Sequence, residues 1–392
     1  MPKSPKDRPI RILHTADWHL GREFHGADLT EAHQHFFDWL AGQIEERQVD
    51  VVIMAGDIFD RALPPAASVE LLNDQLARLS DLCEVALIAG NHDSMKRLSY
   101  GPLLKAGIHL ASGTTGIGNA IALDRRGIEL LIYPIPYLDP GLAAPEMGVE
   151  EARHQAVLQA AFDRCRADLA AREGSPRSVA VAHAFVRGAE ESESERTISI
   201  GDADQVPPSL LEGFDYVAMG HLHRPQQVAD GIQYSGSPIP LSFSEVGPGL
   251  SKSVTVVDLP ATGPPAIEIV EVPQHREFDR ISGTLDELLA DDAYEDRREH
   301  WLEITLTDET RPDQPMERLR SKFEQIMSLR FESPISTSEE RDAEELTGLA
   351  QADPVELAGR FLGEVRSQGP DQAETALLEE AVKSKAAEEV AG

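Results

Sequence analysis

Short apolar runs recur along the chain, and five of them are followed at once by a loop that carries histidine, aspartate or asparagine. The runs cover residues 10–13, 51–54, 85–89, 179–182 and 217–219. Continuous apolar runs of this kind are typical of strands that are buried on both faces, as in parallel sheets. The pattern therefore predicts five buried strands, each with polar side chains at its carboxyl end.

Amphipathic stretches separate the first three runs. Residues 30–48 and 64–82 repeat apolar positions at helical spacing: Phe36, Phe37, Leu40 and Ile44 in the first, and Val69, Leu72, Leu76 and Leu79 in the second. Such a stripe predicts a helix that packs one face against a core. The order strand, helix, strand, helix, strand predicts right-handed crossovers between neighbouring parallel strands. The predicted class is therefore α/β.

Beyond Gly107 the expected elements become shorter. Strands are predicted at 117–123 and 128–134, followed by a long helix at 150–172. A four-layer α/β/β/α sandwich, with two sheets face to face and helices outside, accommodates this order. We expect one large domain over residues 9–274, after a disordered N-terminus at residues 1–8.

A second unit is predicted after Pro273. Strand, helix, strand, helix and strand are expected at 278–283, 285–289, 301–306, 316–327 and 328–332. These elements carry no loops of the ligand-bearing kind. Residues 275–335 are therefore interpreted as a small α+β domain that binds or orients the substrate.

The last segment, residues 336–392, has 14 acidic and 5 basic side chains and is expected to be partly a linker. A helix is predicted to start at Asp353, because Pro354 and Glu356 complete an N-cap, N1 and capping-box set. Its apolar positions form a narrow stripe: Val355, Ala358, Leu362 and Val365. Such a stripe is expected to dock on a partner helix, or to pack with a second helix at 377–382 as a hairpin.

Composition limits the class of protein. The 392 residues are 41% hydrophobic and 27% charged, which suffices for one large core and smaller domains. No run approaches the roughly 18 apolar residues of a membrane span, and no apolar segment of a signal peptide follows the first eight residues. The two cysteines, Cys83 and Cys165, form no disulfide framework and are interpreted as structural. We expect a reduced, cytoplasmic location.

The net charge of −32 is unfavourable for binding a polyanion. Phosphate backbones bind Lys and Arg through release of counterions, so a uniformly acidic surface repels them. Attraction to a nucleic acid would then need a local basic groove, metal ions or a basic partner. The even spread of acidic residues also fits a cytoplasm of high salt, which screens the charge.

Seven side chains in the loops after the apolar runs are candidate metal ligands: Asp17, His19, Asp57, Asn91, His183, His221 and His223. Hard divalent ions with mixed ligands need carboxylates, an amide oxygen and neutral imidazoles. Asp17 and His19 stand two residues apart, so both can reach one ion. Asp57 has two carboxylate oxygens and can bridge two ions about 3.5 to 4 Å apart. No cysteine takes part, which argues against a structural zinc site.

His92 follows the candidate ligand Asn91 and is interpreted as a catalyst. A protonated imidazole beside the scissile phosphate can stabilise developing charge or protonate the leaving oxygen. Such a histidine needs a carboxylate to orient it. Asp60, three residues after Asp57, is the first candidate. Asp93 is the second, because a turn or cap role explains it equally well.

Seven other histidines are interpreted as surface or core residues: His25, His33, His35, His109, His154, His275 and His300. A single histidine, or a single Gly-Asn-His-Asp sequence, is weak evidence for a metal site. The candidate ligands gain weight because they occur together, in order, and each after an apolar strand.

The order of these motifs resembles the calcineurin-like metallophosphoesterase superfamily. The shared pattern is Asp17-x-His19, Gly56-Asp57-x-x-Asp60, Gly90-Asn91-His92-Asp93, His183 and Gly220-His221-x-His223. The segments 13–21, 214–223 and 234–238 narrow the resemblance to the SbcD family of nuclease subunits. The resemblance covers most of residues 9–335 and the tail only loosely.

The resemblance implies a four-layer metallophosphoesterase sandwich with a capping domain and a manganese-dependent DNA nuclease activity. Both double-strand exonuclease and single-strand or hairpin endonuclease activity would belong to it. One Mn²⁺, or Mg²⁺ in its place, would lie among Asp17, His19, Asp57 and His223, and a second among Asp57, Asn91, His183 and His221. His92 would assist the transition state.

The resemblance also implies partners. The tail would bind the base of the coiled coil of an SbcC-type ABC ATPase, and two copies of the chain would form a homodimer within a heterotetramer. ATP would act only through that ATPase, because the chain has no Gly-x-x-x-x-Gly-Lys-Ser/Thr loop. The substrates would be double- and single-stranded DNA at the nucleoid, in replication, recombination and repair, with no membrane involved.

Two other functions stay open at this point. The same core in other families hydrolyses phosphoproteins, cyclic nucleotides or small phosphomonoesters, so a phosphatase or non-DNA phosphodiesterase is one alternative. A non-catalytic subunit that tethers DNA is another. The second domain at 278–332 favours the nuclease over the phosphatase, and the complete set of candidate ligands argues against the tether.

Overall fold

A computed structural model of the chain describes residues 8–94, 106–195, 205–247 and 249–332, together with residues 355, 370 and 374–378. The chain divides into two compact units, Met1–Glu332 and Ser333–Gly392. Within the described ranges, no helix combines the length and apolar character needed to cross a membrane.

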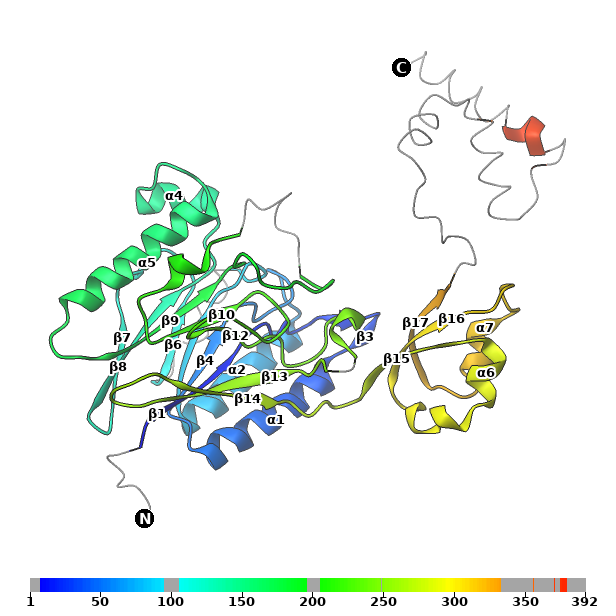
Figure 1. Cartoon of the computed structure of the whole chain (residues 1–392), viewed down its shortest axis with the longest axis horizontal. Coiled ribbons are helices and arrows are strands. Elements are labelled where there is room, and N and C mark those ends of the chain that lie inside the picture. Colours follow the sequence, from blue (N-terminus) through cyan, green and yellow to red (C-terminus); the bar gives the residue numbers. More distant parts are fainter. Residues whose placement is uncertain are drawn as a thin grey trace. The chain divides into compact units, whose positions relative to one another are not determined.

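The first sheet has six strands in the order β14-β13-β1-β4-β5-β6 (Figure 1). Its strands are β1 (Ile10–Thr15), β4 (Val51–Ala55), β5 (Glu84–Ile88), β6 (Ile108–Ala111), β13 (Ser253–Leu259) and β14 (Ala266–Glu271). Strands β1, β4, β5 and β6 are parallel neighbours, as the alternating pattern predicts. The loops that follow β1, β4 and β5 therefore leave the sheet at one edge.

The second sheet also has six strands, in the order β11-β12-β10-β9-β8-β7. Its strands are β7 (Ile121–Arg125), β8 (Ile128–Ile135), β9 (Arg177–His183), β10 (Tyr216–Gly220), β11 (Gln226–Ala229) and β12 (Ile232–Tyr234). Strands β8, β9, β10 and β12 run parallel, and β7 and β11 are antiparallel edges. The loop after β10 therefore starts beside His183 at the end of β9.

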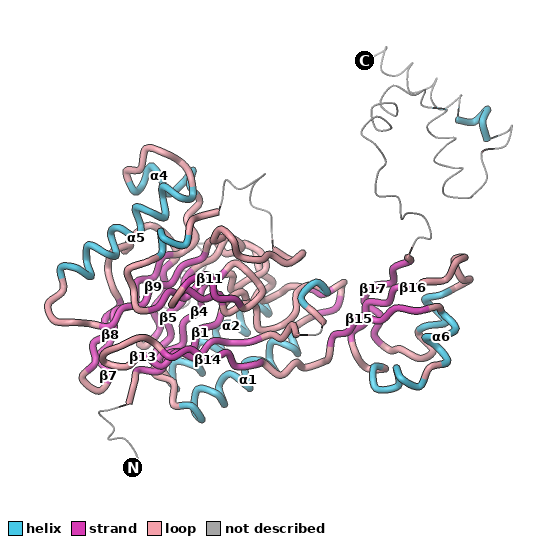
Figure 2. Tube along the Cα trace, viewed as in Figure 1, coloured by secondary structure: helices cyan, strands magenta, loops and turns pink. Residues whose placement is uncertain are grey.

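Helices cover the outer face of each sheet, so the domain has four layers (Figure 2). The helices are α1 (Thr30–Arg47) and α2 (Ala66–Leu82) on the first sheet, and α4 (Pro140–Met147) and α5 (His154–Ala171) on the second. A third apolar cluster fills the space between the sheets and includes Ile12, Ile53, Val181 and Ala218. The predicted α/β/β/α sandwich is confirmed.

The apolar stripe of α1 is buried as predicted, with Phe36, Phe37, Leu40 and Ile44 all inside the core. On α2 the predicted stripe holds for Leu72, Leu76 and Leu79, but Val69 is 37% exposed. Val69 belongs to the first turn of α2, where Ser68 rather than Val69 is buried.

Two elements of the second sheet differ from prediction. The strand expected at 117–123 is instead β7, because Gly116 and Gly118 adopt positive φ and form a turn. Ile117, between them, packs into the core under α5. Helix α4 was not predicted, although its start carries a signal: the Asp139 side chain accepts from the Leu142 amide, and Pro140 occupies the first turn.

A small third sheet follows, in the order β15-β16-β17 with parallel strands. Its elements are β15 (Phe278–Gly283), α6 (Leu285–Ala290), η6 (Asp292–Arg297), β16 (Trp301–Leu306), α7 (Pro315–Leu319) and β17 (Gln325–Phe331). It has its own apolar core, formed between the sheet and helices α6 and α7. The α+β unit is present, whereas the division at residues 274 and 275 stays a prediction, because Met1–Glu332 form one compact unit.

The helix predicted at 316–327 is wrong in its second half. Helix α7 ends at Leu319, and residues from Gln325 onward belong to β17. The apolar positions Met316, Leu319, Phe323 and Ile326 all contact the same core. Helical spacing thus continues across a turn and into a strand, so periodicity alone could not locate the end of the helix.

An aromatic cluster joins this small unit to the large domain. Trp301 of β16 stacks on Phe24, with ring centroids 5.7 Å apart, and Phe278 and Phe243 meet Phe24 edge to face. Phe24 lies in the short hairpin of β2 (Glu23–Phe24) and β3 (Ala27–Asp28), and Phe243 in the turn η5 (Phe243–Glu245). Most of the tail helix predicted from Asp353, and of its neighbour at 377–382, lies outside the described residues.

A histidine hydrogen-bonds across the space between the two large sheets. His14 of β1 is fully buried, and its Nδ1 lies 2.8 Å from the hydroxyl oxygen of Tyr216 on β10. Burial lowers the pKa of His14 to about 3. No pattern in the sequence pointed to this residue, because it stands at the end of an apolar run.

The buried His14 is expected to make stability depend on pH. The unfolded chain binds a proton at this side chain below about pH 6.5, whereas the folded chain does so only near pH 3. The free energy of unfolding therefore falls as pH falls, by about 2 kcal/mol between pH 8 and pH 5 from this residue alone. Denaturant titrations at both pH values should show a smaller loss for His14→Gln than for the unsubstituted chain. Equal losses in both chains would contradict this explanation.

Candidate metal centre

Six of the seven candidate ligands carry groups that fall into compact clusters of potential metal-binding atoms. Among the described residues, Asp17, His19 and His223 form one such group, and Asp57, His183 and His221 form another. Within each group the ligand atoms lie within 4.8 Å of one another, and all six side chains are buried. The seventh candidate, Asn91, contacts the second group through its amide oxygen.

The backbone delivers these side chains in an unusual conformation. Asp17, His19, Asp57 and His221 all have positive φ, between 48° and 105°, which is costly for residues other than glycine. The loops after β1 and β4 support each other, because the Asp17 and His19 amides donate to the carbonyls of Gly56 and Asp57, each at 3.0 Å. The strain thus concentrates where the candidate ligands converge.

The loop after β5 approaches the loop after β4 so closely that position 90 must be glycine. A β-carbon at this position would collide with the carboxylate and the backbone nitrogen of Asp57. The Gly-Asn-His-Asp motif therefore starts with glycine for a steric reason. The packing that results brings Asn91 beside Asp57 and His183.

The first cluster contains two imidazoles whose nitrogens face each other. His19 Nε2 lies 3.1 Å from His223 Nε2 and 3.6 Å from Asp57 Oδ2. Burial lowers the pKa of His19 well below its ordinary value, so its ring is neutral and can offer a lone pair. Burial also raises the pKa of Asp17 to about 7 in the absence of a cation. A divalent cation would bind the lone pair of His19 and would favour the ionised form of Asp17. This donor set therefore fits a divalent cation.

The second cluster is arranged around Asn91. His183 Nε2 lies 2.8 Å from Asn91 Oδ1, and His221 Nδ1 lies 3.2 Å from the same oxygen. His183 Nδ1 lies 2.9 Å from the carbonyl oxygen of Ala55 and donates its proton there, which directs Nε2 to the cluster. Burial lowers the pKa of His221 to about 3. For His183, burial is the largest single effect and lowers the pKa, but the charge and hydrogen bond of Asp57, the charge of Asp17 and the Ala55 carbonyl together outweigh it and raise the pKa to about 9.

Asp57 is shared between the clusters. Its Oδ2 lies 3.6 Å from His19 Nε2 and 3.5 Å from His183 Nε2, so it faces one imidazole of each. Although burial alone would raise the pKa of Asp57, the charge and hydrogen bond of His183, together with the imidazoles of His19 and His92, outweigh burial and hold this pKa well below its usual value. An ionised carboxylate between two sets of imidazoles is the arrangement that a bridging ligand needs.

His92 lies beside this carboxylate. Its Nε2 is 3.9 Å from Asp57 Oδ2, and its ring meets His19 edge to face at 4.7 Å between centroids. His19, Asp57 and His92 also form a third group of potential ligands, so geometry permits His92 to bind a metal as well as to act as a catalyst. Its catalytic role stays a prediction.

The orientation of His92 corrects the predicted role of Asp60. His92 Nδ1 lies 2.7 Å from the backbone carbonyl oxygen of Asp60, which accepts its proton. The Asp60 carboxylate instead accepts from Arg22 at 3.2 Å and lies 3.7 Å from His19 Nδ1. Asp60 therefore orients His92 through its main chain, and its side chain supports a candidate ligand.

Asp93 has the turn role that was its alternative. Its partly buried carboxylate accepts from the amides of Ile58, Phe59 and Gly90 at 2.8 to 3.1 Å. These bonds tie the loop after β4 to the loop after β5. Burial raises the pKa of Asp93 to about 7.

The seven histidines interpreted as surface or core residues do not belong to the clusters found among the described residues. His33, for example, is buried and bonded to the carbonyls of Leu29 and Trp18. Sequence reasoning missed four residues that surround His223: Ser194, Glu195, Glu245 and Lys252. They come from loops and turns rather than strand ends, so no spacing in the sequence indicated them.

Comparisons with known proteins identify the family of the chain. Residues 10–225 match the calcineurin-like phosphoesterase family, and residues 274–366 match the Type 5 capsule protein repressor C-terminal domain. The D subunit of the nuclease SbcCD from Escherichia coli K12 is 32% identical over 314 residues, which are 76% of this chain and 78% of that protein. Its namesake from Bacillus subtilis is 36% identical over 271 residues, 64% of this chain and 66% of that protein.

Among solved structures, a dimetal phosphatase from Danio rerio aligns with a TM-score of 0.39 and 14% identity. The alignment covers 68% of this chain and 98% of that one. A likeness of this size carries no functional weight.

Proposed function

The chain belongs to the calcineurin-like metallophosphoesterases and, among them, to the SbcD nuclease family, and from this premise we propose that it is a manganese-dependent DNA nuclease. The observation that carries the proposal is the ionised Asp57 between two buried imidazole clusters. A relative that is named a nuclease and a donor set suited to two divalent ions support the same reaction class, hydrolysis of a phosphodiester.

In this proposal each cluster holds one cation. Asp17, His19, Asp57 and His223 would hold the first, and Asp57, Asn91, His183 and His221 the second. When bound, such ions polarise the phosphate and lower the pKa of water. The chain's own contribution is to fix the donors before substrate arrives: Ala55 sets the proton position of His183, and the loop contacts hold Asp17 and His19.

His92 would act on the leaving oxygen. Because the Asp60 carbonyl binds the proton on Nδ1, Nε2 is the atom that faces Asp57 and the clusters. A protonated Nε2 in this position can donate to the departing oxygen or stabilise charge that develops there.

The remaining parts of the chain would serve the substrate and the partner. The unit formed by β15 to β17 would cap the site and orient DNA, and the acidic tail would bind an SbcC-type ATPase, which would supply ATP hydrolysis. A homodimer within such a complex would bring two sites to one DNA. The names of the relatives, as subunits of SbcCD, support this assembly.

A panel of substrates and metals tests the proposal. The purified chain is expected to cut linear and hairpin-ended duplex DNA with Mn²⁺, less with Mg²⁺, and not with EDTA, because chelation removes both cations. Product analysis on gels would measure cutting, and a phosphomonoester would serve as the competing substrate. Turnover of the monoester without DNA cleavage would favour a phosphatase, and metal binding without any turnover would favour a tethering subunit.

A further inference from the structure

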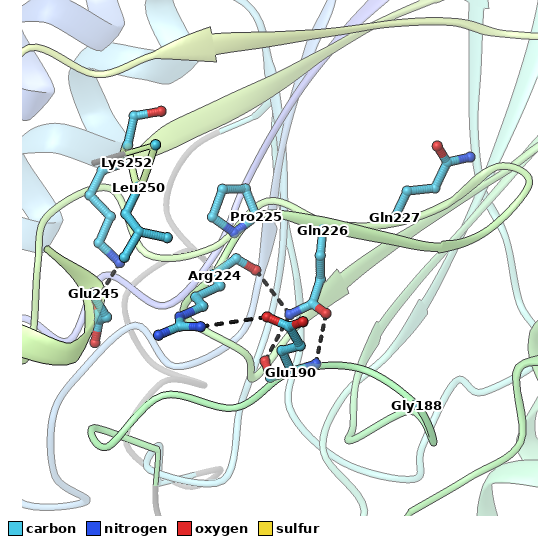
Figure 3. Close-up of a pocket in the computed structure, with 11 residues that line it drawn as sticks. Gly188, Glu190, Arg224, Pro225, Gln226, Gln227, Glu245, Leu250 and Lys252 are labelled. Carbon is cyan, nitrogen blue, oxygen red and sulfur yellow. Dashed lines mark hydrogen bonds and ion pairs between the residues drawn. The ribbon is translucent and has the colours of Figure 1, made fainter. Parts of the chain in front are cut away.

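A polar pocket of about 440 Å³ has Arg224, Glu245 and Lys252 in its lining (Figure 3). Glu245 and Lys252 also contact His223. On one side of the pocket Lys252 and Glu245 point toward each other, and on the other Arg224, Gln226 and Glu190 interact. Glu245 and Lys252 are almost fully buried, with 3% and 5% exposure. A buried ion pair beside a candidate ligand needs an explanation, because desolvation of two charges is costly.

Lys252 is not available to bind an anion in this pocket. An ammonium group has three protons to donate. The Lys252 ammonium donates to the His223 carbonyl at 2.9 Å, to Ser237 Oγ at 2.8 Å, and to Glu245 Oε2. All three donors are therefore used inside the protein. The role of Lys252 is to keep Glu245 ionised and to hold the main chain of His223.

Glu245 Oε1 lies 3.6 Å from His223 Nδ1, beyond hydrogen-bond distance, and the Ser194 hydroxyl bridges the two atoms. Ser194 donates its only hydroxyl proton to Glu245 Oε1. Ser194 Oγ also lies 2.5 Å from His223 Nδ1, so in this second contact it must accept, and Nδ1 must carry the proton. The neighbouring Ser192 hydroxyl donates its only proton to Glu195 Oε2 at 2.6 Å, and therefore not to Ser194.

This polarity decides which nitrogen of His223 is free. A proton on Nδ1 leaves the lone pair on Nε2, and Nε2 is the atom 3.1 Å from His19 Nε2 in the first cluster. The main chain of His223 is fixed as well, because its amide donates to Glu195 Oε1 at 2.8 Å and its carbonyl accepts from Lys252. Ring and backbone are thus held by two segments far apart in the sequence, residues 194–195 and residues 245–252.

We propose that Glu245 is a positioning residue for the first cation, and that it acts through Ser194 to fix the tautomer and direction of His223. The inference rests on the proposed function only in the identity of the cation. A carboxylate behind a ligand histidine raises the basicity of the ligating nitrogen and removes the cost of orienting the ring. Here the Glu245 carboxylate acts through the Ser194 hydroxyl, and Lys252 is its counter-charge.

The test interrupts the relay at Ser194, which leaves the buried ion pair intact. Ser194→Ala is expected to weaken Mn²⁺ binding at one of the two sites by about 10- to 100-fold in calorimetry, and Ser194→Thr, which keeps the hydroxyl, is expected to restore it. Glu245→Gln should weaken binding similarly. Should the unpaired Lys252 unfold that variant, Ser194→Ala still decides the matter. Glu190→Gln, in the same pocket without contact to His223, should bind Mn²⁺ normally.

A second readout needs no metal. In the metal-free chain labelled with nitrogen-15 histidine, at a pH high enough to leave the His223 ring neutral, the signals of His223, identified by their loss in His223→Gln, should show the proton on Nδ1. Ser194→Ala should shift His223 to a mixture of tautomers. Unchanged Mn²⁺ affinity or an unchanged tautomer in Ser194→Ala would overturn the inference. A chain that binds no Mn²⁺ at all would instead contradict the proposed function, and the tautomer would still be measurable.

Discussion

Replacing Asp57 with alanine is expected to abolish binding of both cations and, with it, DNA cleavage. The reason is the shared position of this carboxylate, whose Oδ2 lies about equally far from one imidazole of each cluster, at 3.6 and 3.5 Å. Removal of a single group that stabilises developing charge costs about 10² to 10³ in rate. Loss of a bridging ligand should cost at least that much, because it weakens both sites at once.

Asp57→Asn separates the charge from the shape of this residue. The amide oxygen can still accept from the His92 amide, which donates to Asp57 Oδ1 at 2.9 Å, so the loop should keep its form. Metal content by mass spectrometry and binding by calorimetry should nevertheless fall in both variants. Asp258→Asn, on a surface pair with Arg11, is the control and should behave as the unsubstituted chain. Full metal content in Asp57→Ala with normal cleavage would exclude a bridging role.

The large domain could be predicted well because the information for it is local. Each of the five apolar runs is a strand buried on both faces, so the run and the polar loop after it can be recognised without knowledge of contacts. Parallel neighbours then bring the loop residues to one edge. The positions of Asp17 and Asp57, on neighbouring strands of one sheet, follow from this reasoning, whereas the position of His183 also depends on the second sheet facing the first.

What the sequence could not show depends on backbone conformation and on long-range contacts. Asp60 was predicted to orient His92 by its carboxylate, but the contact is made by its carbonyl, whose direction the residue type does not set. Glu245 is 22 residues after His223 and lies in a short 3-10 turn, so nothing in the motif points to it. The end of α7 was misjudged because helix, turn and strand contribute to one apolar core.

His92→Gln is expected to retain both cations and to lower the rate of DNA cleavage by about 10² to 10⁴. Glutamine can keep a bond to the Asp60 carbonyl but cannot carry a transferable proton. Calorimetry with Mn²⁺ and single-turnover cleavage would measure the two effects separately. His19→Gln is the matched comparison, because His19 belongs to the same compact group but is a predicted ligand. This variant should lose metal affinity, whereas His92→Gln should keep it.

The leaving group decides how His92 acts. A nitrophenyl phosphodiester releases a weakly basic oxygen that needs no protonation, so a general acid at Nε2 predicts a much smaller deficit for His92→Gln on this substrate than on DNA. If His92 instead stabilises charge on the phosphate, the deficit should be the same on both substrates. Loss of Mn²⁺ affinity in His92→Gln would reject both roles and make His92 a ligand, which its distance of 3.9 Å from Asp57 Oδ2 permits.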